Sequence, residues 1–389
     1  MTRHNSTNSL LQLATFFSIF TILGFFFHSF AQSSESGTVK LTKCSEFQIE
    51  SPVADALSSD AQKVYIGTVD GSVRTLNSNL SAVLWRTELG GEIVSNIVSA
   101  EAGLFVVSNP VMSSDTVSTE SVLRSLSKET GVPNWSVRLP FSERFFIGSI
   151  QGVVSVVSLD GWAASIDTLA GRVKWKTPSF GKITARPSFL NGILFGTAEK
   201  KIIMVSAETG ETVFKASTDF IPTAITYPSP DTLVVGDERG NVASIGFPDG
   251  KNIWKFKSGA AVSFVQVSKE GLYITSLDNF IYLISMYNGD VIWKRRLPGR
   301  VIEGGLVLNG FVAVLIFGEN SAFLIDSKKG KIVDQLEQND KNFVNQVPVA
   351  IRNSGLLVTT SDIVTLYSIK NCSLEIGKAG STTPPLTKK

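Results

Sequence analysis

The stretch IDTLAGRVKW, residues 166–175, carries a tryptophan four residues after a glycine, and this arrangement recurs along the chain. Six stretches align on that glycine, at successive steps of 40, 39, 40, 39 and 41 residues. The other five are LSKETGVPNW (126–135), VSAETGETVF (205–214), IGFPDGKNIW (245–254), ISMYNGDVIW (284–293) and IDSKKGKIVD (325–334). Such a fixed period is the mark of a repeat architecture, in which each unit buries its apolar faces against its neighbours.

One position of the repeat is aromatic in nearly every unit. Weaker copies flank the series on both sides, and in the seventh unit the aromatic is replaced by Asp334. A residue that recurs in almost every unit serves a need that every unit shares, so packing between units explains it better than ligand stacking does. The aromatic residues at this position are Trp85, Trp135, Trp175, Phe214, Trp254 and Trp293.

Each unit contains four short β-type runs. In the sixth unit the runs VSFVQVS, LYITS, FIYLIS and DVIWKRR are rich in Val, Ile, Tyr and Phe, and turn residues separate them. Four such runs predict a four-stranded antiparallel meander. Eight tandem meanders of about 40 residues predict an all-β, eight-bladed β-propeller.

The first residues after the N-terminal region predict how the ring closes. KCSEFQIE, residues 43–50, aligns with the outer-strand position and is expected to add a strand to the last blade, beside NCSLEI at 371–376. Cys44 and Cys372, the two cysteines of the chain, would then lie close together. An exported protein can form a disulfide between them.

The N-terminus has the pattern of a targeting segment. An apolar run spans residues 10–27, and the small residues Ser29 and Ala31 precede Gln32. Residues 1–31 are therefore interpreted as a secretory signal peptide, with an uncleaved signal anchor as the alternative. Residues 32–43 are expected to be a linker, 44–376 the propeller and 377–389 a disordered tail. The protein is expected to be exported, to a periplasmic or extracellular location.

Charge and histidine content exclude several functions. A formal net charge of +2 gives no basic surplus of the kind that nucleic-acid binders need, so no nucleic-acid partner is expected. His4 and His28 both precede Gln32. A chain cleaved there has no histidine for general-base catalysis or for metal ligation, and we expect neither catalytic nor metal-binding residues.

The recurring scheme of Gly, Asp-Gly, a hydrophobic run, Thr-Gly and Trp resembles the pyrroloquinoline-quinone-type propeller repeat, over about residues 44–376. One branch of that family, the quinoprotein dehydrogenases, implies a bound quinone with calcium and, in many members, adjacent cysteines, which this chain lacks. In size and blade count the chain is similar to the other branch, the non-catalytic BamB-like propellers of envelope assembly. The resemblance implies no cofactor on that reading, and pyrroloquinoline quinone with calcium on the alternative one.

Binding residues are expected on the face that carries the loops between second and third strands and between blades. Residues 109–121 form the largest insertion in the repeat and are a candidate partner-binding loop. Trp162 is the one tryptophan away from the repeat position. Aromatic and arginine side chains are favoured anchors of protein interfaces. The candidate partner-binding residues on this face are Trp162, Phe141, Arg144, Phe180, Arg186, Arg296 and Arg300, with Phe145, Lys182, Arg295 and Glu303 beside them.

These patterns predict a monomeric, non-catalytic scaffold that binds a protein partner through the loop face or the mouth of the axial channel. A membrane contact is expected only if the signal segment is retained. A quinone- and calcium-dependent oxidoreductase is the first alternative, and a carbohydrate-binding module is the second.

Overall fold

The computed structural model describes residues 39–110, 120–301, 305–316, 321–337, 348–352, 354–369 and 372. All of them belong to one compact unit, Val39–Lys389. The predicted signal segment, most of the insertion at 109–121 and the predicted tail lie outside the described residues. Every regular element in the described ranges is a β-strand. These ranges accordingly contain no helix long and apolar enough to cross a membrane.

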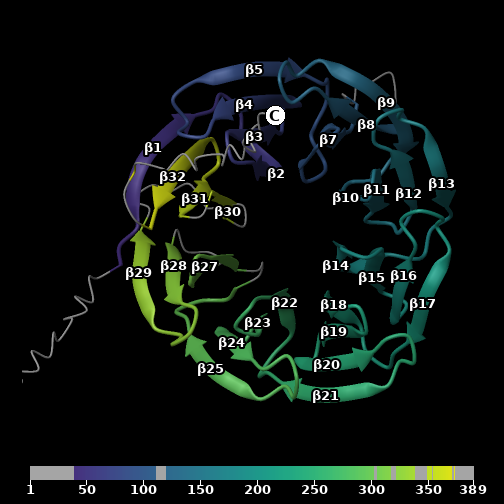
Figure 1. Ribbon diagram of the computed structural model, residues 1–389, viewed down its shortest axis with the longest axis vertical. Helices are drawn as coiled ribbons and strands as arrows, with labels where there is room; N and C mark the ends of the chain where they lie inside the picture. The colour runs from purple at the N-terminus through teal and green to yellow at the C-terminus, as the bar shows by residue number, and fades with distance from the viewer. Residues whose placement is uncertain are drawn as a thin grey trace, which may run out of the picture. The chain divides into compact units, whose positions relative to one another are not determined.

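The 32 strands form eight four-stranded antiparallel sheets arranged in a ring, so the eight-bladed propeller is confirmed (Figure 1). Blades 1 to 4 consist of β2 (Val53–Ser59), β3 (Lys63–Thr68), β4 (Ser72–Asn77) and β5 (Val83–Glu88); β6 (Val98–Ala100), β7 (Gly103–Ser108), β8 (Glu120–Leu126) and β9 (Pro133–Pro140); β10 (Phe145–Ile150), β11 (Val153–Ser158), β12 (Ala163–Asp167) and β13 (Val173–Thr177); and β14 (Ile183–Phe189), β15 (Ile193–Thr197), β16 (Lys201–Val205) and β17 (Thr212–Ser217).

Blades 5 to 8 complete the ring, and the last of them combines the two ends of the propeller. They consist of β18 (Pro222–Ser229), β19 (Thr232–Asp237), β20 (Asn241–Gly246) and β21 (Asn252–Lys257); β22 (Val262–Val267), β23 (Leu272–Ser276), β24 (Phe280–Ile284) and β25 (Val291–Arg296); β26 (Leu306–Leu308), β27 (Phe311–Leu315), β28 (Ser321–Asp326) and β29 (Ile332–Glu337); and β30 (Val349–Ile351), β31 (Gly355–Thr359), β32 (Ile363–Ser368) and β1 (Thr42–Gln48).

The position of a strand within its blade explains its composition. A second strand such as β11 is covered on both faces by the neighbouring blades, and all six residues of its VVSVVS run are buried. Its central Ser155 is satisfied by a 2.7 Å hydrogen bond to Ser165 of β12. An outer strand such as β21 has one face toward the ring and one toward solvent, so buried and exposed residues alternate along it. The outer strands form the perimeter in Figure 1.

The hydrophobic core is divided into eight clusters, one at each junction between blades. The cluster between blades 2 and 3, for example, joins Phe105 and Leu123 to Phe145 and Val154. A single blade therefore has no core of its own, and each blade depends on both neighbours for burial.

The repeat tryptophans connect successive blades. Trp175 on the outer strand of blade 3 lies against Gly210 in the turn between the third and fourth strands of blade 4, where an added Cβ would come within 2.5 Å of its ring. Its Nε1 donates a 2.9 Å hydrogen bond to the carbonyl oxygen of Ala207 in the same turn. Trp85, Trp135, Trp254 and Trp293 donate equivalent hydrogen bonds, at 2.9 to 3.0 Å.

The junction between blades 4 and 5 is built differently. Phe214 takes the tryptophan position there and packs on Phe247, with ring centroids 5.6 Å apart. Phe214 has no N–H to donate to the turn. No side chain covers Gly250, since an added Cβ there would meet nothing within 4 Å. A cavity of about 540 Å³ lies beside this junction, between β17 and the strands β20 and β21.

Blade 8 closes the ring with an N-terminal strand, as the sequence predicted, but the partner of that strand is residues 363–368 and not the expected NCSLEI stretch. β1 pairs antiparallel with β32, from Thr42 opposite Ser368 to Gln48 opposite Ile363. Cys44 and Cys372 form a disulfide with their Cα atoms 5.2 Å apart. β1 begins at Thr42, two residues before the predicted start of the propeller.

Closure also explains why the tryptophan pattern ends in blade 7. The next blade has no turn between its third and fourth strands, because its outer strand β1 comes from the other end of the propeller. Asp334 instead accepts a 2.6 Å hydrogen bond from the backbone N–H of Leu41, just before β1. On β1 itself, Ser45 follows the bulge as the tryptophans do, and its hydroxyl donates a 2.6 Å bond to the carbonyl oxygen of Asn79 in blade 1.

Candidate functional site

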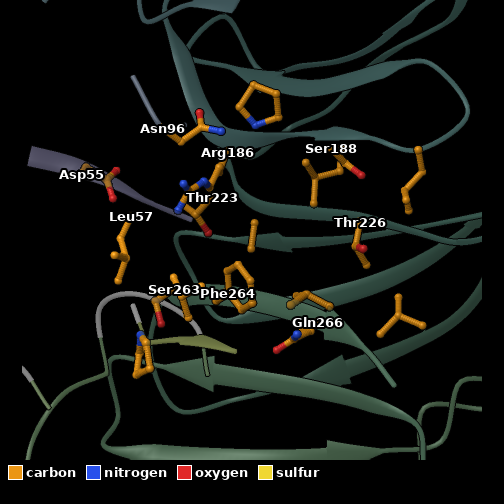
Figure 2. Close-up of a pocket in the computed structure, with 18 residues that line it drawn as sticks. Asp55, Leu57, Asn96, Arg186, Ser188, Thr223, Thr226, Ser263, Phe264 and Gln266 are labelled. Carbon is orange, nitrogen blue, oxygen red and sulfur yellow. The ribbon is translucent and has the colours of Figure 1, made fainter. Parts of the chain in front are cut away.

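Inner strands from several blades surround a cavity of about 510 Å³ at the centre of the ring. Its walls come from β2, β14, β18, β22 and β30, together with the segment before β6. Figure 2 shows the labelled side chains converging on this space from separate blades. The residues that line it are Asp55, Leu57, Asn96, Arg186, Pro187, Ser188, Leu190, Thr223, Ala224, Ile225, Thr226, Ser263, Phe264, Val265, Gln266, Val267, Pro348 and Val349.

Several polar side chains of this wall connect one blade to the next. The hydroxyl of Thr223 donates a 2.6 Å hydrogen bond to the carbonyl oxygen of Val262, and that of Ser263 does the same to Val301. The amide of Asn96 makes two bonds, of 2.9 and 3.0 Å, with the backbone of Ile147. These groups hold adjacent inner strands in register, so their hydrogen-bonding capacity is already used.

Arg186 and Gln266 are side chains of the wall that can recognise a ligand. Arg186 is exposed in the channel and makes no hydrogen bond or ion pair with any residue that the structure describes. The Oε1 atom of Gln266 is buried and has no hydrogen-bond partner among the described parts of the chain. A free guanidinium and a free amide carbonyl suit polar or anionic groups of a partner.

A charge pair lies at the edge of the channel. Arg144, in the loop between β9 and β10, pairs with Asp55 of the inner strand β2, and both side chains are partly exposed. The guanidinium also lies 5.3 Å from the ring centroid of Phe146. Arg144 is thus held by the fold, and the Asp55 carboxylate is the single acidic group of the described channel lining.

The loop face brings four of the predicted binding residues together around the turn at residues 158–162. The N–H of Leu159 donates a 2.8 Å bond to the carbonyl oxygen of Arg144, and that of Phe180 donates a 3.0 Å bond to Gly161. Phe141 is 39% exposed and lies in the same loop as Arg144. We name the cluster of Phe141, Arg144, Trp162 and Phe180 the blade 3 rim.

Two aromatic side chains of the blade 3 rim are less available than the sequence suggested. Trp162 is half-buried against the core cluster between blades 2 and 3. Phe180 packs on Phe195, with ring centroids 5.3 Å apart. Both contribute to packing as well as to the surface.

The remaining candidates lie apart from this rim. Arg296 ends β25 and Arg300 follows it in the loop to blade 7, and both are exposed. Phe145 is fully buried in the core, so its expected place in a binding surface was wrong. Arg295 contacts the next blade, because its Nε donates to the carbonyl oxygen of Gly330. Lys182 is exposed, and Glu303 lies outside the described residues.

The insertion between β7 and β8 is described only at its ends. The amide nitrogen of Asn109 donates a 3.2 Å bond to the carbonyl oxygen of Ser142, and Ser121 donates a 2.6 Å bond to Oδ1 of Asn109. The described ends of this segment, Asn109 and Ser121, therefore lie beside Ser142, in the loop that carries Phe141 and Arg144.

Aspartates at the repeat turns are occupied by turn hydrogen bonds. Asp167 accepts bonds from the N–H groups of Leu169 and Ala170, and these bonds hold the pKa of its carboxyl below the ordinary value. Asp326 accepts the equivalent bonds in blade 7, and Asp160 accepts a bond from the hydroxyl of Ser142. Turn structure accounts for these carboxylates, as the sequence predicted.

The channel residues do not fit a calcium-bound quinone. Calcium takes six to eight oxygen ligands, several of them carboxylates. The described lining offers one carboxylate, that of Asp55, and Arg144 pairs with it. Nowhere in the described ranges do three or more His, Cys, Asp or Glu side chains form a group suited to a metal ion.

Sequence comparison agrees with this architecture. The profile of the family described as outer membrane protein assembly factor BamB matches residues 118–255 and 198–368, which together span more than half of the chain. The chain belongs to the BamB family. One BamB protein, from Shewanella oneidensis, is 23% identical over 307 residues, covering 77% of this chain and 67% of the relative.

Other similarities to BamB-family members and propellers concern the fold or a part of the chain. The crystal structure of BamB from Moraxella catarrhalis superposes with a TM-score of 0.63 at 16% identity, covering 85% of this chain and 98% of that one. A tetrathionate hydrolase from Acidithiobacillus ferrooxidans is 26% identical over 118 residues, which are 29% of this chain and 22% of the hydrolase.

The channel lining is what sequence reasoning missed. Arg186 was selected as a loop residue, whereas it lies on β14 and faces the channel. Asp55, Gln266 and Ser263 were not selected, since each is one polar residue within an otherwise ordinary strand run. The signal that could have identified these channel-lining residues is a polar residue that recurs at one position in the first strands of several blades.

Proposed function

We propose that this BamB-family chain is an exported, non-catalytic scaffold that binds a protein partner in envelope assembly, without a quinone or a metal cofactor. The observation that carries the proposal is the family match across the propeller, together with a channel whose described lining supplies no ligand set for a metal. The BamB relatives are named as outer membrane protein assembly factors, which makes a protein partner the first expectation.

The loop face is the proposed partner surface. The blade 3 rim supplies an exposed aromatic side chain, Phe141, beside a positioned guanidinium, Arg144. The ends of the 109–121 insertion are fixed at the same place. Arg186 in the channel and the exposed Arg296 and Arg300 would extend the contact to the channel mouth and to blade 6. Trp162 and Phe180, which pack partly into the core, would hold Phe141 and Arg144 in place. We propose that the propeller itself acts as a monomer.

Site-specific photocrosslinking in the native host tests this surface. Benzoylphenylalanine would replace Phe141 or Arg300 on the loop face, and Leu169 or Tyr287 on the opposite face. The controls suit the comparison because Leu169 is 79% and Tyr287 is 85% exposed, in turns between third and fourth strands. Adducts to one envelope protein from the loop-face positions alone are the expected result. Equal adducts from both faces would contradict the proposal.

Catalysis is tested on the same purified protein. Added pyrroloquinoline quinone and calcium are expected to leave its absorbance spectrum equal to the sum of the components. Saturable quinone binding with dye reduction by alcohols or sugars would overturn the non-catalytic assignment. Saturable glycan binding at the loop face would support the carbohydrate-binding alternative instead.

A further inference from the structure

The outer strands of blades 3 to 6 carry a strong charge asymmetry. β13, β17, β21 and β25 contain eight basic residues and no Asp or Glu. These strands follow one another along the perimeter in Figure 1. We name their solvent-facing side the basic wall. Its basic residues are Lys174, Lys176, Lys215, Lys255, Lys257, Lys294 and Arg296, whereas Arg295 turns toward blade 7.

The outer strands of the other blades lack this surplus. β29 contains Asp334 and Glu337 and no basic residue. On β1 the one lysine, Lys43, pairs with Glu46, and on β5 the one arginine, Arg86, pairs with Glu88 and Glu50. The positive charge is thus a property of one side of the ring, even though the chain as a whole is close to neutral.

Exposed aliphatic side chains lie among these lysines at a fixed position. In blades 4, 5 and 6 the residue before the repeat aromatic is Val213, Ile253 and Ile292, which are 51%, 55% and 51% exposed. A lysine follows two residues later in each strand, also exposed: Lys215, Lys255 and Lys294. Register places the three aliphatic–lysine pairs at the same height in adjacent blades.

The wall also has a recess. The cavity of about 540 Å³ beside the blade 4–5 junction is lined by charged side chains of both signs and by the apolar side chains of Ile202 and Ile245; the charged residues are Arg239, Lys255, Lys257, Asp219 and Asp237. It occurs where Phe214 replaces the repeat tryptophan.

We infer that the basic wall docks the propeller edge-on against a bilayer that contains anionic phospholipid. Lysines are attracted to the anionic headgroups, while short aliphatic side chains enter the interface between headgroups and acyl chains. A nucleic acid would use the charge and leave the three aliphatic side chains in water, so the bilayer matches the surface better. This inference goes beyond the proposed function, which concerns the loop face.

The convex perimeter sets the centre of the contact. A flat bilayer touches the middle of a curved wall first, and blade 5 is the middle of the three aliphatic–lysine pairs. Ile253, Lys255 and Lys257 are therefore expected to contribute most. Acidic residues flank the wall at both ends of the strands: Glu208 pairs with Lys174 and Asp249 with Lys251 at one end, and the exposed Asp219 follows β17 at the other.

Vesicle co-sedimentation of the full chain tests the inference. The wild-type protein is expected to bind phosphatidylcholine vesicles that contain phosphatidylglycerol, and to dissociate as salt is raised, because exposed charges are screened. The triple variant Lys215→Glu, Lys255→Glu, Lys294→Glu is expected to bind about 100-fold more weakly. The matched control is Lys328→Glu, Lys329→Glu, Lys331→Glu, which changes net charge equally at exposed positions in and beside a blade 7 turn. The control is expected to retain binding.

A second variant separates the aliphatic contribution. Ile253→Ser with Ile292→Ser is expected to lower vesicle binding about tenfold without altering its salt dependence. The double variant removes apolar area that the bilayer would bury, and it changes no charge. Far-UV circular dichroism and an unchanged unfolding transition establish that each variant is folded.

Several outcomes would overturn the inference. Equal binding by both triple variants would do so, as would equal, salt-independent binding to pure phosphatidylcholine, which would assign membrane contact to the apolar N-terminal segment. Wild-type protein that binds single-stranded DNA or polyglutamate but not the anionic vesicles would show that the wall serves a different polyanion.

Discussion

The indole of Trp254 in blade 5 covers Gly289 in blade 6 so closely that an added Cβ on the glycine would lie 2.7 Å from Cε3 of the ring. The same indole donates a 2.9 Å hydrogen bond to the carbonyl oxygen of Met286. One residue thus supplies apolar contact and a satisfied hydrogen bond to the next blade. Because each blade is held only by its neighbours, such junctions set the stability of the ring.

Gly289→Ala is expected to lower the free energy of unfolding by about 2–4 kcal/mol, from left-handed backbone strain and steric conflict with Trp254. Gly250→Ala is the matched control, because the φ angles are +74° at Gly289 and +73° at Gly250, while no atom lies within 4 Å of the Cβ position at Gly250. The control should lose only the strain, about 1–2 kcal/mol. Urea unfolding measures both, and equal losses would contradict the role of the indole.

Restoring the repeat tryptophan is expected to have opposite effects at its two exceptions. Phe214→Trp should raise the free energy of unfolding by about 1 kcal/mol. The turn at Gly250 has space for the larger ring, and the indole N–H would donate a hydrogen bond to this turn that Phe214 cannot make. Asp334→Trp should lower it by about 1–2 kcal/mol, because the acceptor for Leu41 is lost and blade 8 has no turn to receive the ring. Stabilisation by both substitutions would show that the closure hydrogen bond is unimportant.

Removal of the Cys44–Cys372 disulfide is expected to cost up to about 5 kcal/mol, since the bond closes a loop with a sequence separation of 328 residues. Cys44→Ser, Cys372→Ser and the double variant should lose equal stability, because each removes the same bond. Unfolding with and without dithiothreitol checks this. The reductant should destabilise the wild type alone, and additive losses in the double variant would argue for separate thiol contributions.

Alkaline pH is expected to destabilise the ring through its buried tyrosines. Burial, followed by the nearby charge of Glu270, raises the pKa of Tyr273 to about 12. Burial and the hydrogen bonds to Asp60 and Asp278 raise the pKa values of Tyr65 and Tyr282 as well. Below pH 10 the tyrosines are protonated in both states, so their contribution is constant.

Above pH 10 the unfolded chain loses these protons first, and the free energy of unfolding should fall by up to about 1.4 kcal/mol per pH unit for each tyrosine. For Tyr273 this loss ends near pH 12. Tyr273→Phe should show a shallower decline in unfolding measured from pH 9 to 12. Tyr287→Phe, at a position 85% exposed, is the control with the wild-type profile. Identical profiles for both variants would contradict the assignment.

The repeat made most of the fold predictable. A turn glycine and an aromatic residue at a step of about 40 residues fixed the blade boundaries, and the third strand expected at Ala163–Asp167 was found there. Closure was predictable because residues 43–50 align with the outer-strand position, although their partner strand, residues 363–368, differs from the expected NCSLEI stretch. These signals are local, and each unit repeats them.

The candidate sites were harder to predict because they depend on convergence across blades. Thr223 and Ser263 look alike in sequence, and only the ring places them on one channel wall. Trp162 occupies the predicted turn, but its half-burial depends on blade 2 as much as on its own blade. Phe214 was interpreted as one aromatic among six, and nothing in the sequence indicated the cavity beside its junction, whose walls come from β17, β20 and β21.

The pairing of β1 with β32 has a consequence for the order of folding. Seven blades consist of consecutive strands and can form as the chain is made, whereas blade 8 needs residues 42–48 to find residues 363–368. Until the last strand is available, β1 has no partner edge and the faces of blades 1 and 7 are uncovered. The nascent ring is therefore an incomplete arc, and the blades at its two ends expose apolar faces that can associate with other chains. Closure of blade 8 is expected to be the slow step, at which chaperone protection matters most.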